Sequence, residues 1–304
     1  MGIGLTKYYD KKTKTLTIPF DFSGELKDLP PDTKMITFNQ NYKIGQLSVF
    51  NKKIDNLPAT LTCLTFGWNF NQEIGHKGCN DVNCSRNLPN SLTHITFGYW
   101  FSQKVNNLPD GITHLTLGHY FNQMVDILPD SLIDLTFGHY FNQIINNLPT
   151  TLTHLTFGNC FNQIVDNLPK NLTHLTFGNY FNQKVDNLPE SLIHLTIGAM
   201  FDKKVDNLPK NLIYLTFGDS FNQKVDNLPD SMSHLTFGNY FNQKVDNLPN
   251  NLTHLTFGVL FNQVVDNLPL NIEKIKIRRD KQNLIKKIPF GCEVIDDNGT
   301  KRLL

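Results

Sequence analysis

Several features that mark common protein classes are scarce in this 304-residue chain. No 18 consecutive residues are apolar, so no segment predicts a membrane-spanning helix. The five cysteines are scattered and predict no disulfide framework. No secretory leader is evident at the start, so we expect a reducing intracellular setting, in the cytoplasm or, for a viral protein, in the host cytoplasm.

The chain also lacks an excess of positive or negative charge. The 28 Lys and Arg nearly balance the 27 Asp and Glu, and the formal net charge is +1. This balance predicts no general affinity for nucleic acid or for membranes. At 39 % hydrophobic and 18 % charged residues, the chain is nevertheless too apolar to be disordered.

The chain instead contains a phrase of 20 residues that occurs nine times in succession between Leu92 and Asn271. One copy, residues 172–191, reads LTHLTFGNYFNQKVDNLPES. Counted from its first Leu, apolar residues stand at positions 1, 4, 6, 10, 14 and 17 of the phrase. A fixed period of this length is the signature of a solenoid, in which successive coils stack around a continuous core.

Each copy contains one short strand pattern. Leu175, Thr176 and Phe177 alternate apolar and polar side chains, and the Gly at position 7 ends the run. A Pro at position 18 interrupts any longer helix. We therefore predict a mainly β fold, a right-handed leucine-rich-repeat-like solenoid with one parallel sheet and little or no helix.

The same registers extend beyond the regular copies and predict four regions. These are an N-terminal cap strand, three N-terminal coils of which two carry insertions, the nine regular repeats, and a degenerate C-terminal capping coil with a tail. Their expected bounds are 1–12, 13–91, 92–271 and 272–304. A terminal coil that loses its aromatic residues is expected, because its outer face has no neighbour to cover it.

The motifs LTFG, FNQ and LP, at residues 175–178, 181–183 and 188–189, resemble the FNIP repeat family. These leucine-rich-repeat-like repeats occur in slime-mould proteins and in giant viruses of amoebae. The chain departs from the family at position 13, where the family often has Pro and this chain has residues such as Lys184 and Ile144. The resemblance implies an interaction scaffold, and we expect no catalytic activity and no cofactor.

The outward strand positions 3 and 5 are the candidate binding face. Position 5 is Thr throughout the regular copies, for example Thr156, Thr176 and Thr196. Position 3 is His in seven copies and Asp or Tyr in the other two: His94, His114, Asp134, His154, His174, His194, Tyr214, His234 and His254. Two interpretations stay open: a polar ladder that only solvates the sheet, or a stripe that recognises an acidic or metal-bearing partner.

The function that we predict is protein–protein interaction through this His/Thr face by a monomeric chain whose partner is unknown. One alternative is a β-solenoid enzyme that acts on polysaccharide, but such chemistry needs converging carboxylates and Asp134 is the only acid on the stripe. Another is a surface binder that uses its Thr ladder, although the outward pair here is His and Thr. A straight His ladder does not converge as a Zn²⁺ site requires, so we expect no dedicated metal site.

Two further patterns fall outside the regular copies. The insertion GHKGCNDVNCSR predicts an exposed loop, with a Zn²⁺ site of His76, Cys79 and Cys84 as the alternative. Gly2 lies in a Met-Gly-x-x-x-Thr pattern that fits N-myristoylation, and we expect no membrane contact unless that residue is acylated.

Asn at position 11 predicts one more ladder. It recurs in most copies, and a buried Asn side chain can satisfy backbone groups of the neighbouring turn. We therefore expect a structural role for these residues.

Overall fold

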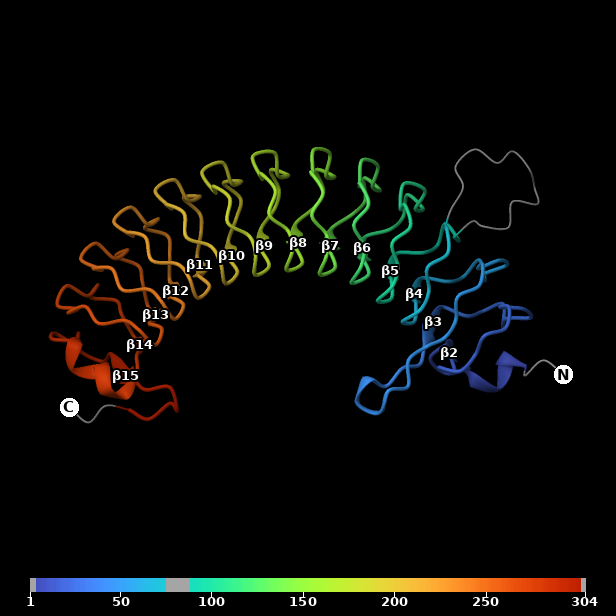
Figure 1. Cartoon of the computed structure of the whole chain (residues 1–304), viewed down its shortest axis with the longest axis horizontal. Helices are drawn as coiled ribbons and strands as arrows, with labels where there is room; N and C mark the ends of the chain where they lie inside the picture. Colours follow the sequence, from blue (N-terminus) through green and yellow to red (C-terminus); the bar gives the residue numbers. More distant parts are fainter. Residues whose placement is uncertain (1–3, 75–87, 302–304) are drawn as a thin grey trace. The chain divides into compact units, whose positions relative to one another are not determined.

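The structure, a computed structural model, describes residues 4–74 and 88–301 of the chain (Figure 1). His76, Cys79, Cys84 and Gly2, which carried the predicted metal alternative and the acylation site, lie outside these residues. The chain divides into two compact units, Met1–Leu152 and Thr153–Leu304. In the described residues, no helix combines the length and the apolar character that crossing a membrane requires.

Unit 1 is built from short strands that pair in chain order (Figure 1). From β2 onward each strand is parallel to the next, so the predicted parallel sheet is confirmed. Its strands are β1 (Tyr9–Asp10), β2 (Thr15–Ile18), β3 (Met35–Phe38), β4 (Cys63–Thr65), β5 (His94–Thr96), β6 (His114–Thr116) and β7 (Asp134–Thr136).

Unit 2 repeats this arrangement with eight strands, again parallel and in chain order. The strands are β8 (His154–Thr156), β9 (His174–Thr176), β10 (His194–Thr196), β11 (Tyr214–Thr216), β12 (His234–Thr236), β13 (His254–Thr256), β14 (Lys274–Lys276) and β15 (Glu293–Ile295). The only helices in the described residues are 3-10 turns: η1 (Leu5–Tyr8), η2 (Tyr42–Ile44) and η3 (Arg279–Leu284). A mainly β solenoid of about 20-residue coils is thus the observed fold.

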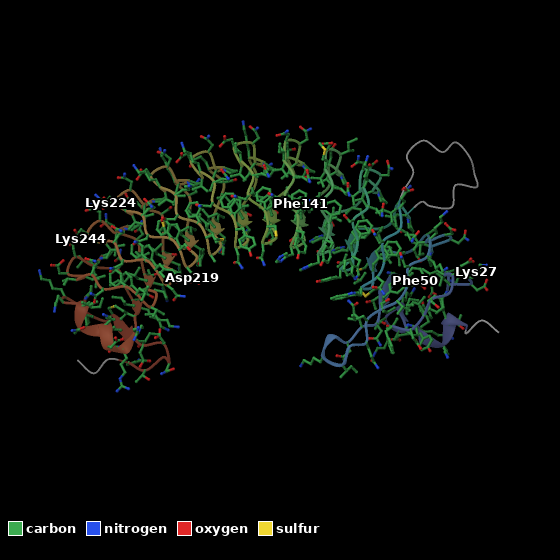
Figure 2. The ribbon with its side chains drawn as sticks, in the orientation of Figure 1. Lys27, Phe50, Phe141, Asp219, Lys224 and Lys244 are labelled. Atoms are coloured by element: carbon green, nitrogen blue, oxygen red, sulfur yellow. The ribbon has the colours of Figure 1, made fainter. Side chains whose placement is uncertain are left out.

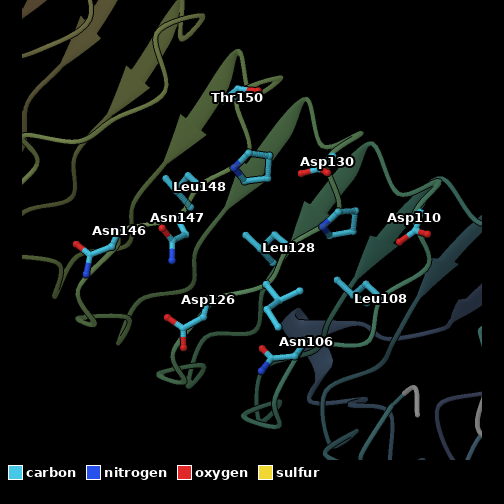
Figure 3. A pocket seen from close by; sticks show the side chains of 13 residues that line it. Asn106, Leu108, Asp110, Asp126, Leu128, Asp130, Asn146, Asn147, Leu148 and Thr150 are labelled. Atoms are coloured by element: carbon cyan, nitrogen blue, oxygen red, sulfur yellow. The ribbon is translucent and has the colours of Figure 1, made fainter. Parts of the chain in front are cut away.

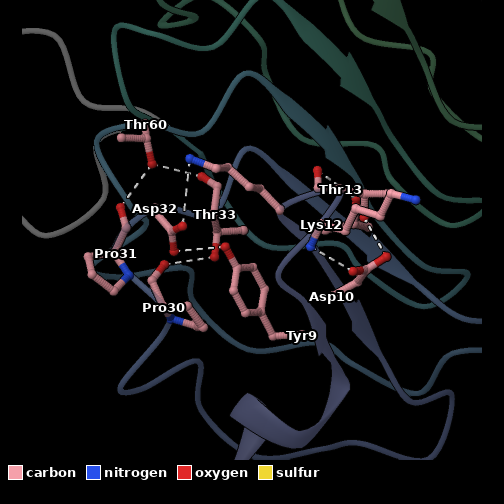
Figure 4. Close-up of polar contacts among 11 residues, drawn as sticks. Tyr9, Asp10, Lys12, Thr13, Pro30, Pro31, Asp32, Thr33 and Thr60 are labelled. Carbon is pink, nitrogen blue, oxygen red and sulfur yellow. Dashed lines mark hydrogen bonds and ion pairs between the residues drawn. The ribbon is translucent and has the colours of Figure 1, made fainter.

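The N-terminal end differs from the cap strand expected over 1–12. It folds as the 3-10 turn η1 followed by the two-residue strand β1, which pairs antiparallel with β2. Side chains fasten this end to the first coils (Figure 4). The Tyr9 hydroxyl donates to Asp32 Oδ1 at 2.7 Å, and Lys14 Nζ lies 3.7 Å from Asp32 Oδ2. These contacts link the cap to the turn before β3.

Phenylalanine rings fill the core of each unit. Within one coil, the rings of Phe177 and Phe181 stack with centroids 3.7 Å apart. Between coils, the Phe181 ring lies 6.2 Å from those of Phe161 and Phe201. All four rings are buried, and Figure 2 shows the labelled Phe141 and Phe50 inside their coils. Each buried ring contributes about 1.5–3 kcal/mol of transfer free energy, and the stack continues from one coil to the next.

The Gly at position 7 is required by a close approach between coils. A Cβ placed on Gly178 would lie 2.2 Å from the carbonyl oxygen of Gly158. On Gly138 it would lie 1.8 Å from the oxygen of Gly118. No side chain fits at these distances, so this register sets how tightly neighbouring coils pack.

The Asn ladder at position 11 forms as a chain of hydrogen bonds between coils. The backbone N–H of Asn142 donates to Asn122 Oδ1 at 2.9 Å, and Gln143 Nε2 donates to the same oxygen at 3.1 Å. The expected burial is wrong, because Asn122 and Asn142 are exposed. The ladder therefore connects the turns at the surface.

Candidate functional site

The position-3 side chains of unit 2 form one continuous stack of rings. Strand pairing aligns each of them with its neighbour on the next strand. Ring centroids lie 4.2 Å apart for His154–His174, His174–His194 and His194–Tyr214, 4.5 Å for Tyr214–His234, and 4.3 Å for His234–His254. We call these six rings the imidazole stack: His154, His174, His194, Tyr214, His234 and His254.

Tyr214 continues this stack, although the sequence suggested a break in the His row. Its ring lies parallel to His194, at an interplanar angle of 4°, and tilts by 32° from His234. An aromatic phenol has the planar shape of an imidazole, so the stack tolerates the exchange.

Unit 1 carries a shorter version of the same row. The rings of His94 and His114 stack at 4.1 Å, and Asp134 follows His114 on the next strand.

The Thr residues at position 5 form a second row. In unit 2, Thr156, Thr176 and Thr196 pair in register along the strands. The structure thus places the predicted His and Thr residues of each unit on consecutive strands as two rows.

Hydroxyl groups at position 2 orient the imidazoles. The Thr113 hydroxyl donates to the carbonyl oxygen of Thr93 at 3.2 Å and lies 2.8 Å from His114 Nδ1. Because a hydroxyl has a single hydrogen, its oxygen then accepts from Nδ1, which carries the proton of the neutral ring. Thr93 and His94 make the same contacts. In each of these rings Nε2 is left as the hydrogen-bond acceptor.

The surroundings of four position-3 imidazoles, His94, His174, His194 and His234, disfavour the charged form of the ring. Partial desolvation, followed by repulsion from neighbouring imidazoles, lowers the pKa of His174 below its usual value. The same two causes lower the pKa of His94 and His194. For His234, desolvation again comes first and His254 second, partly offset by Glu273. These shifts favour the neutral form of His94, His174, His194 and His234 near pH 7.

A second aromatic surface in unit 1 was missed by the sequence reasoning. It occupies positions 8 and 9, directly after Gly at position 7, where the repeat is most variable. The signal was present as the pairs Tyr99–Trp100, His119–Tyr120 and His139–Tyr140. We call this surface the aromatic patch, and its residues are Trp68, Tyr99, Trp100, His119, Tyr120, His139 and Tyr140.

The aromatic patch consists of two columns of stacked rings. At position 8, Trp68, Tyr99, His119 and His139 follow one another with centroids 3.8, 4.3 and 4.7 Å apart. At position 9, the separations are 4.4 Å for Trp100–Tyr120 and 4.7 Å for Tyr120–Tyr140. Rings of different columns meet edge to face, at 81° for Tyr99–Trp100 and 77° for Tyr99–Tyr120.

This geometry is a herringbone. Rings are nearly parallel along each column, at 6° for Trp68–Tyr99 and 5° for Trp100–Tyr120, and nearly perpendicular between the columns. Trp100 and Tyr140 keep 45 % and 41 % of their surface exposed. Partial desolvation, then the nearby Tyr120 hydroxyl, raises the pKa of Tyr99, so its phenol stays a hydrogen-bond donor at neutral pH.

A polar cleft of about 520 Å³ lies elsewhere in unit 1, between the turns that precede successive strands (Figure 3). Asp110, Asp126 and Asp130 line it together with Asn106 and Leu128. Across residues 4–74 and 88–301, no three His, Cys, Asp or Glu side chains are grouped as metal ligands. The cleft presents acceptors but no such cluster.

Family comparison agrees with the repeat geometry. The FNIP Repeat family matches residues 85–118, 121–160, 161–200, 201–240, 224–258 and 241–280. The chain belongs to the FNIP repeat family. Its FNIP repeats supply the Phe of the core, the Asn-Gln of the surface ladder and the Leu-Pro that precedes each strand.

Solved structures resemble this FNIP repeat chain over most of its length. CroV588, described as a novel circular leucine-rich-repeat protein, shares 30 % identity over 93 % of this chain and 63 % of its own, with a TM-score of 0.49. The chain thus spans less than two thirds of CroV588. YopM from Yersinia enterocolitica WA-314 shares 21 % identity over 89 % of this chain and 70 % of its own, with a TM-score of 0.50. No match is found among curated proteins.

Proposed function

We propose that this FNIP repeat chain is a non-enzymatic scaffold that binds another protein through its outward strand face, formed by positions 3 and 5. The observation that carries the proposal is the imidazole stack. Its six rings are held in register by strand pairing and by contact with each other, from 4.2 to 4.5 Å. Binding such a prearranged surface costs little side-chain entropy.

The chemistry of the face supports binding over catalysis. Glycoside hydrolysis needs two carboxyl groups on either side of the scissile bond. Between Thr93 and Thr256, positions 3 and 5 hold a single acid, Asp134, and its strand neighbour His114 is not an acid. A row of rings beside a row of hydroxyls instead combines apolar contact with hydrogen bonding, as protein interfaces do.

The test is quantitative affinity capture with three forms of the full chain. The first is the wild type, and the second carries His154→Ala, His174→Ala and His194→Ala. The control carries Lys184→Ala, Lys224→Ala and Lys244→Ala. Figure 2 shows the labelled Lys224 and Lys244 on the side of their coils away from Asp219. Thermal unfolding of each form confirms that it is folded.

We expect the His variant to lose proteins that the wild type and the Lys variant both retain. A lost protein must then bind the purified wild-type chain directly. Identical sets of captured proteins for the wild type and the His variant would overturn the proposal.

A further inference from the structure

We propose that the aromatic patch of unit 1, together with His94, His114 and Asp134, binds a protein segment rich in arginine. The inference rests on the proposed function, since it names the chemistry of a partner protein that would bind unit 1 at the aromatic patch and at position 3 of its strands. Four observations carry it: an uncovered aromatic ring, a set of hydrogen-bond acceptors, the local charge, and contact between the rings themselves.

The uncovered ring is Trp100, which begins the position-9 column. One of its faces stacks on Tyr120, whereas the preceding coil has Asn69 at this register, so no ring of the column covers the other face. The side chain is 45 % exposed. Tyr99 stands perpendicular to it with centroids 5.4 Å apart. An exposed indole face beside a perpendicular phenol ring is suited to a guanidinium group, which is attracted to the face of an aromatic ring and stacks on it.

The acceptors are on the strands that lead into the patch. His94 and His114 hold their proton on Nδ1 through Thr93 and Thr113, so their Nε2 atoms accept hydrogen bonds. Asp134 adds a carboxylate at the next strand. Arginine has five N–H donors and no acceptor, which complements a row of this kind.

Local charge points to the same partner. Between Leu88 and Thr150 the chain has one Lys and no Arg, against four acids, of which Asp134 is on strand β7 and Asp110, Asp126 and Asp130 line the separate cleft of Figure 3. Lys104, the single cation, stands at position 13, the register at which Figure 2 shows Lys224 and Lys244 directed away from Asp219. A single-stranded nucleic acid would need a positively charged groove beside the rings. A cationic segment instead meets one acid, Asp134, and no Lys or Arg at positions 3, 5, 8 and 9 of these coils.

Mutual contact makes the patch rigid. Tyr120 stacks on both Trp100 and Tyr140 and meets Tyr99 at 77°. With His119, which it also meets edge to face, its ring is thus held by four others before any partner binds. Aromatic residues that are fixed in this way are typical anchors of protein interfaces, because little side-chain freedom is lost on binding.

The test measures fluorescence anisotropy of labelled peptides with the full chain. Three peptides share one Gly-spaced sequence and carry Arg, its neutral isostere citrulline, or Glu. We expect the Arg peptide to bind, with an affinity that falls as salt rises, and the other two to bind at least about tenfold more weakly.

Variants locate the site. Trp100→Ala is expected to weaken the Arg peptide by about tenfold, Asp134→Asn to weaken it less, and Trp100→Phe to retain most of the affinity. The matched control is Tyr180→Ala with Tyr240→Ala, since both residues are exposed at the same register of unit 2. The control should change the Kd less than twofold.

Four outcomes would overturn the inference: no binding of the Arg peptide, equal binding of the citrulline peptide, tighter binding of the Glu peptide, or an unchanged Kd for Trp100→Ala in a chain with wild-type Tm. The proposed function is tested separately by the capture experiment on the imidazole stack of unit 2. Loss of captured proteins there, combined with no binding of the Arg peptide, would reject this inference and leave the scaffold proposal standing.

Discussion

The Thr173 hydroxyl makes two contacts that determine the tautomer of His174. It donates to the carbonyl oxygen of Thr153 at 3.1 Å and lies 2.9 Å from His174 Nδ1. Its one hydrogen is used on the carbonyl, so it accepts from Nδ1. Neutral His174 therefore carries its proton on Nδ1 and presents Nε2 as a lone-pair acceptor. The threonine before the strand decides what the outward row offers to a partner.

This relationship predicts a change of tautomer on removal of the hydroxyl. In the wild type at pH 8, the ¹⁵N chemical shifts of His174 should show a protonated Nδ1 and an unprotonated Nε2. In Thr173→Val the acceptor is gone, and the population should move toward a protonated Nε2. Ile193 precedes His194 and has no hydroxyl, so His194 is a control within the same stack. Unchanged shifts at His174 in Thr173→Val would contradict the assignment.

Stability is predicted to fall in mild acid. The pKa values of His94, His174 and His194 are lowered in the folded chain, so the unfolded chain binds protons more readily near pH 6.5. Their contribution is complete above about pH 6.5 and decreases as pH falls below it. The Tm should be lower at pH 5.5 than at pH 7.5, a range above the usual carboxyl pKa values of about 3.9–4.3.

A variant separates this effect from the other titrating groups. His174→Asn removes one titrating ring and its repulsion of His154 and His194. It should reduce the difference in Tm between the two pH values, even if it lowers both. Equal Tm values for the wild type at pH 7.5 and 5.5 would show that the stack has no influence on proton binding.

The Gly column predicts a position where a single methyl group is costly. A Cβ on Gly178 would lie 2.2 Å from the oxygen of Gly158, so Gly178→Ala must push two coils apart. We expect a loss of about 1–3 kcal/mol in the free energy of unfolding, measured by urea denaturation. Gly4→Ala is the control, since its Cβ would meet Thr6 Oγ1 at an ordinary 3.7 Å. A loss below about 0.5 kcal/mol for Gly178→Ala would mean that the coils are not packed as described.

The contacts of the N-terminal cap predict that Tyr9 ionises at a higher pH than an ordinary tyrosine. Partial desolvation, then the hydrogen bond to Asp32, raises the pKa of Tyr9 to about 12. Its contribution to stability is present below the usual pKa of about 10 and is lost as pH rises from there toward 12. Ultraviolet titration of the wild type minus Tyr9→Phe should give a difference curve centred well above pH 10. A curve centred near 10 would exclude the bond to Asp32.

The sequence predicted most of the fold because one rule is repeated. Phe177, Phe181 and the Gly178 between them occupy registers that recur in most copies. A structural assignment that is ambiguous in one copy is therefore supported by the other copies. The N-terminal end had no such repetition. There, the η1 turn and the antiparallel strand β1 occur once, and the contact of Tyr9 with Asp32, 23 residues away, leaves no periodic trace.

The candidate site was predictable in its registers and less so in its chemistry. The His row was evident, but the role of Thr173 in orienting His174 depends on where the hydroxyl lies relative to the preceding coil. In the sequence, Tyr214 interrupts the His row because its residue type differs. In the structure, its planar ring stacks as an imidazole does and continues the row. The aromatic patch was overlooked since positions 8 and 9 vary, and their stacking becomes visible only when Trp100 and Tyr120 are placed on adjacent coils.

Within each unit, each regular coil repeats the same interface with its neighbouring coils. Duplicating or deleting one whole 20-residue copy would join two surfaces that already match, with Gly against Gly and Phe against Phe. The core would need no compensating substitution. The imidazole stack and the aromatic columns could thus be lengthened or shortened by one ring for each repeat that is added or removed. The number of repeats would set the length of the binding surface, and the side chains at positions 3, 8 and 9 would set its chemistry.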